Sequence, residues 1–400
     1  MSKKEIAIEQ LEIGMFVTAL DVSWLKTPFF KHSMLIDNEL QIVALKNCGA
    51  KLVTIDIEKG KQPSKPNQPA DNKVIPPAEK TLKPTSLHNE LETAKHIKES
   101  AKKAMQSLFA AVQEGGTPKI EIVSSFVNQT IDSLSRNSQA LINIFLSKRQ
   151  SSKLYTHAFN VMSISLLLAQ KLGYSQEEQK QIGLAALLMD IGWLKIPGQF
   201  FTFHTAYTND EFSFTKKHVD YSLQLIEKGD FDPEIHQAIA QHHERYNGDG
   251  YPAGLGGEQI HPMSRILSLA DNFDSLANGY YDKSPIIPAR ALQEIYKKAL
   301  QSSHEPSLVQ LLISLIGVYP PSSAVLLNTG ERGVVTVVNW RAPLAPRVKI
   351  FYNKTFMPLM RPFEVDLAKQ ENESTIRKIQ AVIDPTLPGQ DPAGLLGCEE

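Results

Sequence analysis

The stretch that decides the fold, His242–Leu276, reads HHERYNGDGYPAGLGGEQIHPMSRILSLADNFDSL. It starts with the pair His242-His243, and a glycine-rich turn segment containing Gly250-Tyr251-Pro252 follows. Apolar residues then recur at three- and four-residue spacing, which predicts a helix over Pro262–Asn278 that carries Asp271. Imidazole and carboxylate groups beside an apolar stripe need partners, so this stretch predicts a chemically active site in a helical domain.

Three residues upstream have the same character. His157 lies in LYTHAFNV, Asp190 in AALLMDIG and His218 in TKKHVDYS, each on or beside the apolar stripe of a predicted helix. Imidazoles and carboxylates without a thiolate suit iron, manganese, zinc or nickel. A carboxylate such as Asp190 can bridge two metals, which can clamp a phosphoester and activate water. From the residues alone, the alternative is a set of unrelated core histidines and helix-end aspartates.

Composition narrows the class of protein. The 400 residues include 42 basic and 43 acidic side chains, a net charge of −1, which argues against DNA as a partner. The two cysteines, Cys48 and Cys398, exclude a disulfide framework and a cysteine zinc site. The start, MSKKEIAIEQ, has no signal-like apolar run, and no segment is apolar over the length of a membrane span. We therefore expect a cytoplasmic protein.

The pattern along the chain predicts a mainly α fold, a helical bundle with a small N-terminal α/β domain and a small C-terminal β-rich segment. The expected parts are an α/β domain (1–58), a Pro/Lys-rich linker (59–88), connecting helices (89–150), a helical domain (151–320), a β-rich segment (321–366) and a flexible tail (367–400). The connecting helices could pair two chains into a homodimer or pack on the protein's own core.

Individual elements follow from periodicity and turn signals. Strands are expected at Phe16–Val22, Lys51–Ile57, Ser323–Asn328, Gly333–Trp340 and Val348–Tyr352. Helices are expected at Asp37–Cys48, Glu90–Gln113, Ile120–Ser147, Lys153–Leu172, Gln176–Asp190, Asp210–Lys228, Pro233–Arg245, Pro262–Asn278, Ile287–Gln301 and Pro306–Val318. This assignment places the His242-His243 pair on the last turn of its helix.

The segment His242–Leu276 closely resembles the signature of the HD-GYP family, a branch of the HD phosphohydrolases that hydrolyses the bacterial second messenger cyclic di-GMP. The block Leu154–Val318 follows the family's order throughout. The N-terminal QLEIGMFV, DVSWLKTPF and LVTID resemble the small domain that often precedes such a block. The resemblance covers nearly the whole chain and implies a helical domain built around divalent metal ions.

Carried over position by position, the resemblance implies a site with two metals. One metal takes His157, Asp190 and Asp271, and the other takes Asp190, His218, His242 and His243. Asp190 bridges them and is the expected catalytic residue. Arg245 and Gly250-Tyr251-Pro252 are expected to contact the substrate.

The sequence departs from the family at the positions that give it its name. Met189 stands where the family has the histidine of its His-Asp pair, and a thioether is a poor ligand for a hard divalent metal. Trp193 replaces a lysine that steadies the phosphate or the bridging hydroxide. Further departures are Gly198 for an aspartate, Phe203 for a lysine, Tyr280 for an arginine, and Lys153 for an acidic third-metal ligand present in some members.

Losing one stabiliser of a developing charge costs about 10²–10³ in rate, so several losses predict little hydrolysis. We expect one retained and one weakened site for iron, manganese or another divalent metal. The expected function is a cyclic di-GMP signalling protein that is weakly active or inactive. It would bind the nucleotide, or dock a signalling protein through its GYP face. The alternatives are an active cyclic di-GMP phosphodiesterase yielding pGpG or GMP, and a phosphohydrolase with another substrate and a more aromatic pocket.

Overall fold

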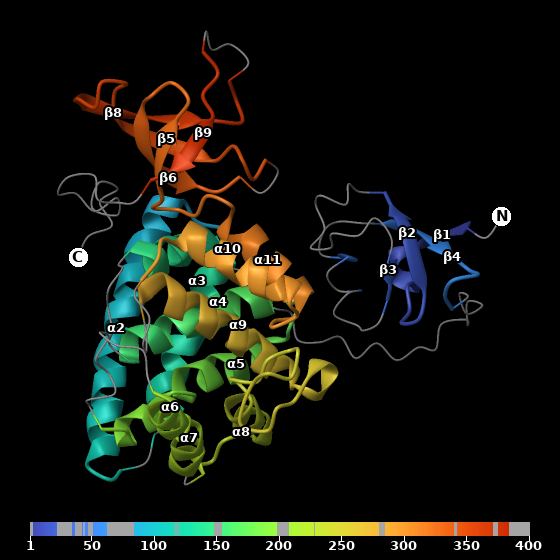
Figure 1. Ribbon diagram of the computed structural model, residues 1–400, viewed down its shortest axis with the longest axis vertical. Helices are drawn as coiled ribbons and strands as arrows, with labels where there is room; N and C mark the ends of the chain where they lie inside the picture. Colours follow the sequence, from blue (N-terminus) through green and yellow to red (C-terminus); the bar gives the residue numbers. More distant parts are fainter. Residues whose placement is uncertain are drawn as a thin grey trace. The chain divides into compact units, whose positions relative to one another are not determined.

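The computed structural model describes residues 3–21, 34–36, 42, 45–46, 51–61, 84–116, 118, 120–147, 154–197, 208–227, 229–279, 285–339, 342–370 and 375–383. The chain forms two compact units, one within residues 1–84 together with 169–175, the other comprising the rest (Figure 1). Most of the predicted helix Asp37–Cys48 lies outside the described residues, as do Lys153, Gly198, Phe203 and Tyr280. Among the described helices, none has the length and hydrophobicity needed to cross a membrane.

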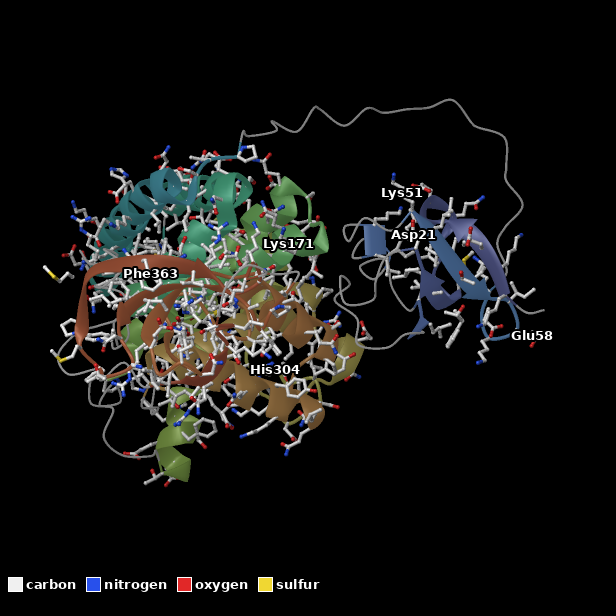
Figure 2. The ribbon with its side chains drawn as sticks, turned by 90° about the horizontal axis from the view of Figure 1, so that it is seen from above. Asp21, Lys51, Glu58, Lys171, His304 and Phe363 are labelled. Atoms are coloured by element: carbon white, nitrogen blue, oxygen red, sulfur yellow. The ribbon has the colours of Figure 1, made fainter. Side chains whose placement is uncertain are left out.

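The N-terminal unit is an antiparallel sheet with strand order β1-β4-β2-β3. Its strands are β1 (Lys3–Ala7), β2 (Phe16–Leu20), β3 (Met34–Leu35) and β4 (Leu52–Asp56). The two strands predicted here are confirmed as β2 and β4, whereas β1 and β3 were not anticipated. The Asp21 carboxylate accepts hydrogen bonds from the Lys51 backbone N–H at 3.0 and 3.1 Å, which ties the end of β2 to the start of β4 (Figure 2).

The second unit starts with two long helices, α2 (Leu87–Gln113) and α3 (Ile120–Ser147). Near the start of α2, the buried Glu90 carboxylate accepts hydrogen bonds from Arg136 Nε and Ser133 Oγ of α3, at 2.8 and 2.7 Å. This pairing sets the two helices antiparallel. Helix α3 bends at Asn137, whose backbone is not helical (φ −163°, ψ 96°).

The helices that follow α3 form the core around the predicted site residues (Figure 1). They are α4 (Leu154–Leu172), α5 (Gln176–Leu188), α6 (Asn209–Thr215), α7 (His218–Ile226), α8 (Pro233–Ala240), α9 (Pro262–Asn278), α10 (Pro288–Leu300) and α11 (Pro306–Ile316). Proline starts each of the last four, where its missing N–H costs nothing.

Three of the predicted helices differ from the structure. The helix expected over Asp210–Lys228 is broken into α6 and α7 by a turn at Lys216-Lys217. The helix expected over Pro233–Arg245 ends at Ala240, so the His242-His243 pair lies in the turn after α8 and not on its last helical turn. The helix expected to reach Asp190 likewise ends at Leu188, and Asp190 caps a short 3-10 helix, η3 (Ile191–Lys195).

The C-terminal strands form an antiparallel sheet in the order β8-β7-β6-β5-β9. Its strands are β5 (Ala324–Leu327), β6 (Arg332–Val337), β7 (Arg347–Tyr352), β8 (Pro358–Asp366) and β9 (Ile379–Val382). The flexible tail predicted from residue 367 is therefore wrong for β9. This strand pairs with β5, and an ion pair of 2.7 Å between Arg377 and Glu331 fixes the chain in front of it.

The mainly helical fold class, with strands at the N-terminus and a sheet near the C-terminus, is confirmed. The exact domain boundaries stay predictions.

The turn between Asp190 and α7 depends on a glycine. A Cβ atom on Gly192 would overlap the carbonyl oxygen of His218 and lie 2.5 Å from the backbone nitrogen of Ser222. The Ser222 hydroxyl accepts a hydrogen bond from Gly192 N–H at 2.8 Å and donates one to the Met189 carbonyl at 2.7 Å. The backbone of η3 therefore lies directly on α7, which brings Asp190 close to His218.

We predict that Gly192→Ala lowers the free energy of unfolding by about 1–3 kcal/mol, because the added methyl group forces η3 away from α7. Urea denaturation followed by circular dichroism measures this loss. Gly256→Ala is the matched control, since its φ is −127° and its added Cβ would meet no atom closer than 3.5 Å. Equal stability of the two variants would contradict the packing argument.

Candidate metal centre

The structure brings the six predicted ligands into one buried cluster. They come from five places in the chain and form two overlapping groups. Within each group, the potential ligand atoms, one from each residue, lie within 4.8 Å of one another. One group is His157, Asp190 and Asp271; the other is Asp190, His218, His242 and His243. Either group could hold a metal ion, and both use the carboxylate of Asp190.

The three-residue group is centred on His157 of α4. Its Nε2 lies 3.1 Å from Asp190 Oδ2 and 3.3 Å from Asp271 Oδ1. On the other side of the ring, Nδ1 donates a hydrogen bond of 2.7 Å to Asp274 Oδ2. The Asp274 carboxylate also accepts hydrogen bonds from the side-chain amides of Asn160 and Asn278. A fixed carboxylate therefore sets the ring orientation, as is typical of metal-binding histidines.

In the four-residue group, backbone carbonyls set the orientation of two histidine rings. His218 Nδ1 donates to the Thr215 carbonyl at 2.7 Å, and His242 Nδ1 donates to the Ile239 carbonyl at 2.6 Å. Because a carbonyl can only accept, Nδ1 carries the proton in each ring, and in the neutral ring Nε2 carries the lone pair. These Nε2 atoms lie 3.3 and 3.8 Å from Asp190 Oδ1.

This donor set fits a divalent cation. His242 Nε2 is buried and makes no hydrogen bond with any residue in the described part of the chain. The Nε2 atoms of His218 and His243 face each other at 3.0 Å. Nitrogen lone pairs gathered around an ionised carboxylate are the ligands that iron, manganese, zinc and nickel accept. The identity of the metal and the number of ions stay predictions.

The electrostatic surroundings leave Asp190 and His218 in the protonation states that ligands need, whereas His157 must release a proton before its Nε2 can bind a metal. Burial lowers the pKa of His218 to about 4, so its ring is neutral at pH 7. Burial works against ionisation of Asp190, but contact with the His157 ring and the other imidazoles holds the pKa of this carboxyl well below its usual range. Burial also opposes protonation of His157, yet its contacts with three carboxylates raise its pKa well above the usual value.

Two of the residues that differ from the family pattern, Trp193 and Met189, lie against this cluster. The Trp193 ring is only 2% exposed and stacks on the ring of His218, with centroids 4.9 Å apart and planes at 20°. It therefore covers a predicted ligand with an uncharged indole. Met189 is fully buried directly before Asp190, and its carbonyl accepts the hydrogen bond from Ser222.

The GYP loop forms one wall of the cluster. The Tyr251 ring stacks on His243 with centroids 4.7 Å apart, and burial raises the pKa of its phenol well above 10. A Cβ on Gly250 would overlap the backbone of Glu244 and Arg245, so this position requires glycine. The Arg245 guanidinium donates to the Ser268 hydroxyl. Of the predicted substrate contacts, Tyr251 thus lies nearest the cluster, whereas Arg245 is engaged with its own domain.

Sequence reasoning missed two residues that hold this site. One is Asp274, which lies one helical turn after Asp271, a spacing that could have identified it. The other is Glu244, whose buried carboxylate accepts hydrogen bonds from the backbone N–H groups of Ala253 and Leu255 at 2.7 and 3.0 Å. Glu244 directly follows the histidine pair, so one short segment supplies two predicted ligands and the anchor of the GYP loop.

We predict that Asp274→Asn weakens binding of Mn²⁺ about 10–100-fold, because an amide is a weaker acceptor for His157 Nδ1–H than a carboxylate. Titration of the metal-free protein with Mn²⁺ by isothermal calorimetry measures the effect. Asp220→Asn, at an exposed position of α7, is the control and should bind as the natural protein does. Unchanged affinity in Asp274→Asn would contradict the orienting role.

Comparison with known proteins agrees with this architecture. The family model of the HD domain matches residues 130–308, a domain of unknown function (DUF3391) matches residues 3–123, and a KOW domain associated with the HD domain matches residues 324–384. A cyclic di-GMP phosphodiesterase of Pseudomonas aeruginosa is 29% identical over 88% of this chain and 85% of its own length.

Other relatives match shorter stretches. A cyclic di-GMP phosphodiesterase response regulator of Xanthomonas campestris is 36% identical over 32% of this chain and 35% of its own length. A 3′3′-cGAMP-specific phosphodiesterase of Vibrio cholerae is 27% identical over 44% of this chain and 38% of its own length. A solved structure of an HDG"Y"P protein from Bdellovibrio bacteriovorus aligns over 78% of this chain and 98% of its own, with 17% identity and a TM-score of 0.45. The chain thus carries an HD domain between two further matched domains, and these matches agree with its resemblance to the HD-GYP family.

Proposed function

We propose that this protein binds cyclic di-GMP at its metal centre, hydrolyses it slowly or not at all, and signals through the bound state. The relatives named as cyclic di-GMP phosphodiesterases support the nucleotide as ligand. The two groups of clustered ligands support retention of metal. The scaffold for binding is thus present, whereas the groups that accelerate hydrolysis are reduced.

The observation that carries this proposal is the position of Trp193. Its indole stacks on His218 where the family resemblance implies a lysine beside the phosphate. An indole offers one N–H and no positive charge, so it cannot neutralise the charge that develops on a phosphoryl group in the transition state. Met189, next to Asp190, adds no strong ligand for a hard cation.

The remaining residues have defined roles in this proposal. The residues of the two ligand groups would hold a divalent metal, which would polarise the phosphodiester as a Lewis acid. Asp190 stays ionised between the two ligand groups, and Asp274 keeps the Nε2 of His157 facing it. Tyr251 remains a neutral phenol that covers His243. These residues bind and orient a ligand, and none of them supplies a positive charge for phosphate at neutral pH once metal occupies the histidine nitrogens.

A second candidate is an active cyclic di-GMP phosphodiesterase. This candidate is favoured because His157, Asp190 and Asp271 still form a group of potential ligands although Met189 stands in place of the family's histidine. Asp274 fixes the ring of His157 in this group. A phosphohydrolase with another substrate, a signalling partner on the GYP face and a homodimer through α2 and α3 stay predictions. The buried Glu90–Arg136 pair supports packing of these two helices within one chain.

Metal content and turnover measured on one purified sample test the proposal. We expect less than two equivalents of metal per chain, because the three-residue group has fewer ligands than the four-residue group. We also expect binding of cyclic di-GMP with turnover near background. Turnover of about 1 per second or more, an ordinary enzyme rate, would establish the phosphodiesterase instead if Asp190→Ala abolished it.

Restoring the lost groups gives a second prediction. Met189→His should raise the metal content but restore little turnover, because the phosphate side still lacks a cation. Met189→His combined with Trp193→Lys should raise turnover beyond either single change, since residues that act as a unit are non-additive. Thermal unfolding of each variant controls for damage, and full activity from Met189→His alone would contradict the role given to Trp193.

A further inference from the structure

An ammonium group lies beside the GYP wall of the metal centre. Lys216 Nζ is 4.7 Å from the ring centre of Phe212 and 4.9 Å from that of Tyr251. The two rings meet edge to face, with centroids 6.2 Å apart and planes at 85°. A cation held against aromatic rings keeps its N–H donors available for a further acceptor.

The position of Lys216 is coupled to that of the metal ligands. Lys216 directly follows the last residue of α6, Thr215, whose carbonyl accepts the hydrogen bond from His218 Nδ1. The Tyr251 ring that Lys216 contacts is stacked on His243. The backbone turn after α6 therefore positions both Lys216 and the predicted ligand His218. The Tyr251 ring contacts both Lys216 and a second predicted ligand, His243.

No acidic residue in the described part of the chain neutralises the charge of Lys216. Lys216 forms no ion pair with any acidic residue among those the structure describes. Arg245, which is expected from the sequence to contact substrate, is engaged with Ser268 and the carbonyl of Glu244. A half-buried ammonium beside a site for phosphodiesters is a point charge suited to a phosphate oxygen.

We infer that Lys216 is a phosphate-binding cation of this site, which supports affinity for the ligand without restoring the charge missing at Trp193. The inference rests on the proposed function and names how that site recognises its ligand. The ligand class is an anionic cyclic dinucleotide, one of whose phosphates contacts Lys216 Nζ at the edge of Tyr251. Lys216 lies on the GYP side of the centre, so it strengthens binding without occupying the place of Trp193 over His218.

The neighbouring lysine is a matched control within the same turn. Lys217 also carries an ammonium near an aromatic ring, 5.2 Å from the centre of Phe214, but its contact does not involve Tyr251. Its side chain is exposed. A general effect of positive charge on nucleotide binding would act on both lysines, whereas a specific contact would act on Lys216 alone.

The test compares Lys216→Gln, Lys216→Arg and Lys217→Gln with the natural full-length protein, each loaded with Mn²⁺. Calorimetry gives the Kd for cyclic di-GMP, and metal analysis with thermal unfolding shows whether each variant is intact. We expect Lys216→Gln to raise the Kd about tenfold and to flatten its salt dependence, with metal content unchanged. Lys216→Arg should keep most of the affinity, and Lys217→Gln should match the natural protein.

Equal Kd values in Lys216→Gln and Lys217→Gln, with tight binding by the natural protein, would overturn this inference and leave the proposed function standing. Absence of cyclic di-GMP binding by the natural protein would overturn both. If Lys216→Gln unfolds, Lys216→Arg decides: binding close to that of the natural protein supports the cation, and a loss as large as about tenfold contradicts it.

Discussion

The buried carboxylate of Asp190 is the group around which the rest of the domain is arranged. An ionised carboxylate costs several kcal/mol to bury unless charged or polar partners compensate for it. Here imidazoles reach it from α4, from α7 and from the turn after α8. The glycine at position 192 lets η3 lie on α7 so that this convergence is possible. The helices therefore form an apolar core and also bring together the polar partners of the Asp190 carboxylate.

The ends of the short helices explain how the imidazoles are held. The last carbonyls of a helix have no partner within the helix. Thr215 is the last residue of α6 and Ile239 lies in the last turn of α8, and their carbonyls accept the Nδ1–H groups of His218 and His242. A longer helix in either place would use up these acceptors. The breaks are thus part of the site, because they turn unsatisfied backbone groups into supports for the histidine rings.

This also explains what could and could not be predicted from the sequence. Apolar periodicity was sufficient for most helices of the bundle, and chemistry together with motif order was sufficient to name the six clustered residues. The pattern did not reveal the breaks after Thr215 and Ala240, because apolar residues resume at Val219 after the first, and no Gly or Pro marks a helix end before Gly248 after the second. Glu244 and Asp274 were missed because their partners, a loop backbone and a ring on α4, are distant in sequence. β9 was missed because a four-residue strand among polar neighbours is too short to show a clear alternation of apolar and polar residues.

The late strand β9 has a consequence for how the chain can be shortened. It pairs with β5 through Val382, Ala381 and Ile379, and so places β5 inside the sheet. Without it, β5 would become an edge strand whose sequence AVLL presents unpaired N–H and C=O groups beside apolar side chains. Such an edge is a template for association with other chains. A protein shortened before residue 379 would keep every residue of the metal cluster but would have an exposed strand edge that favours association. Its solubility would therefore fall although the metal cluster was intact.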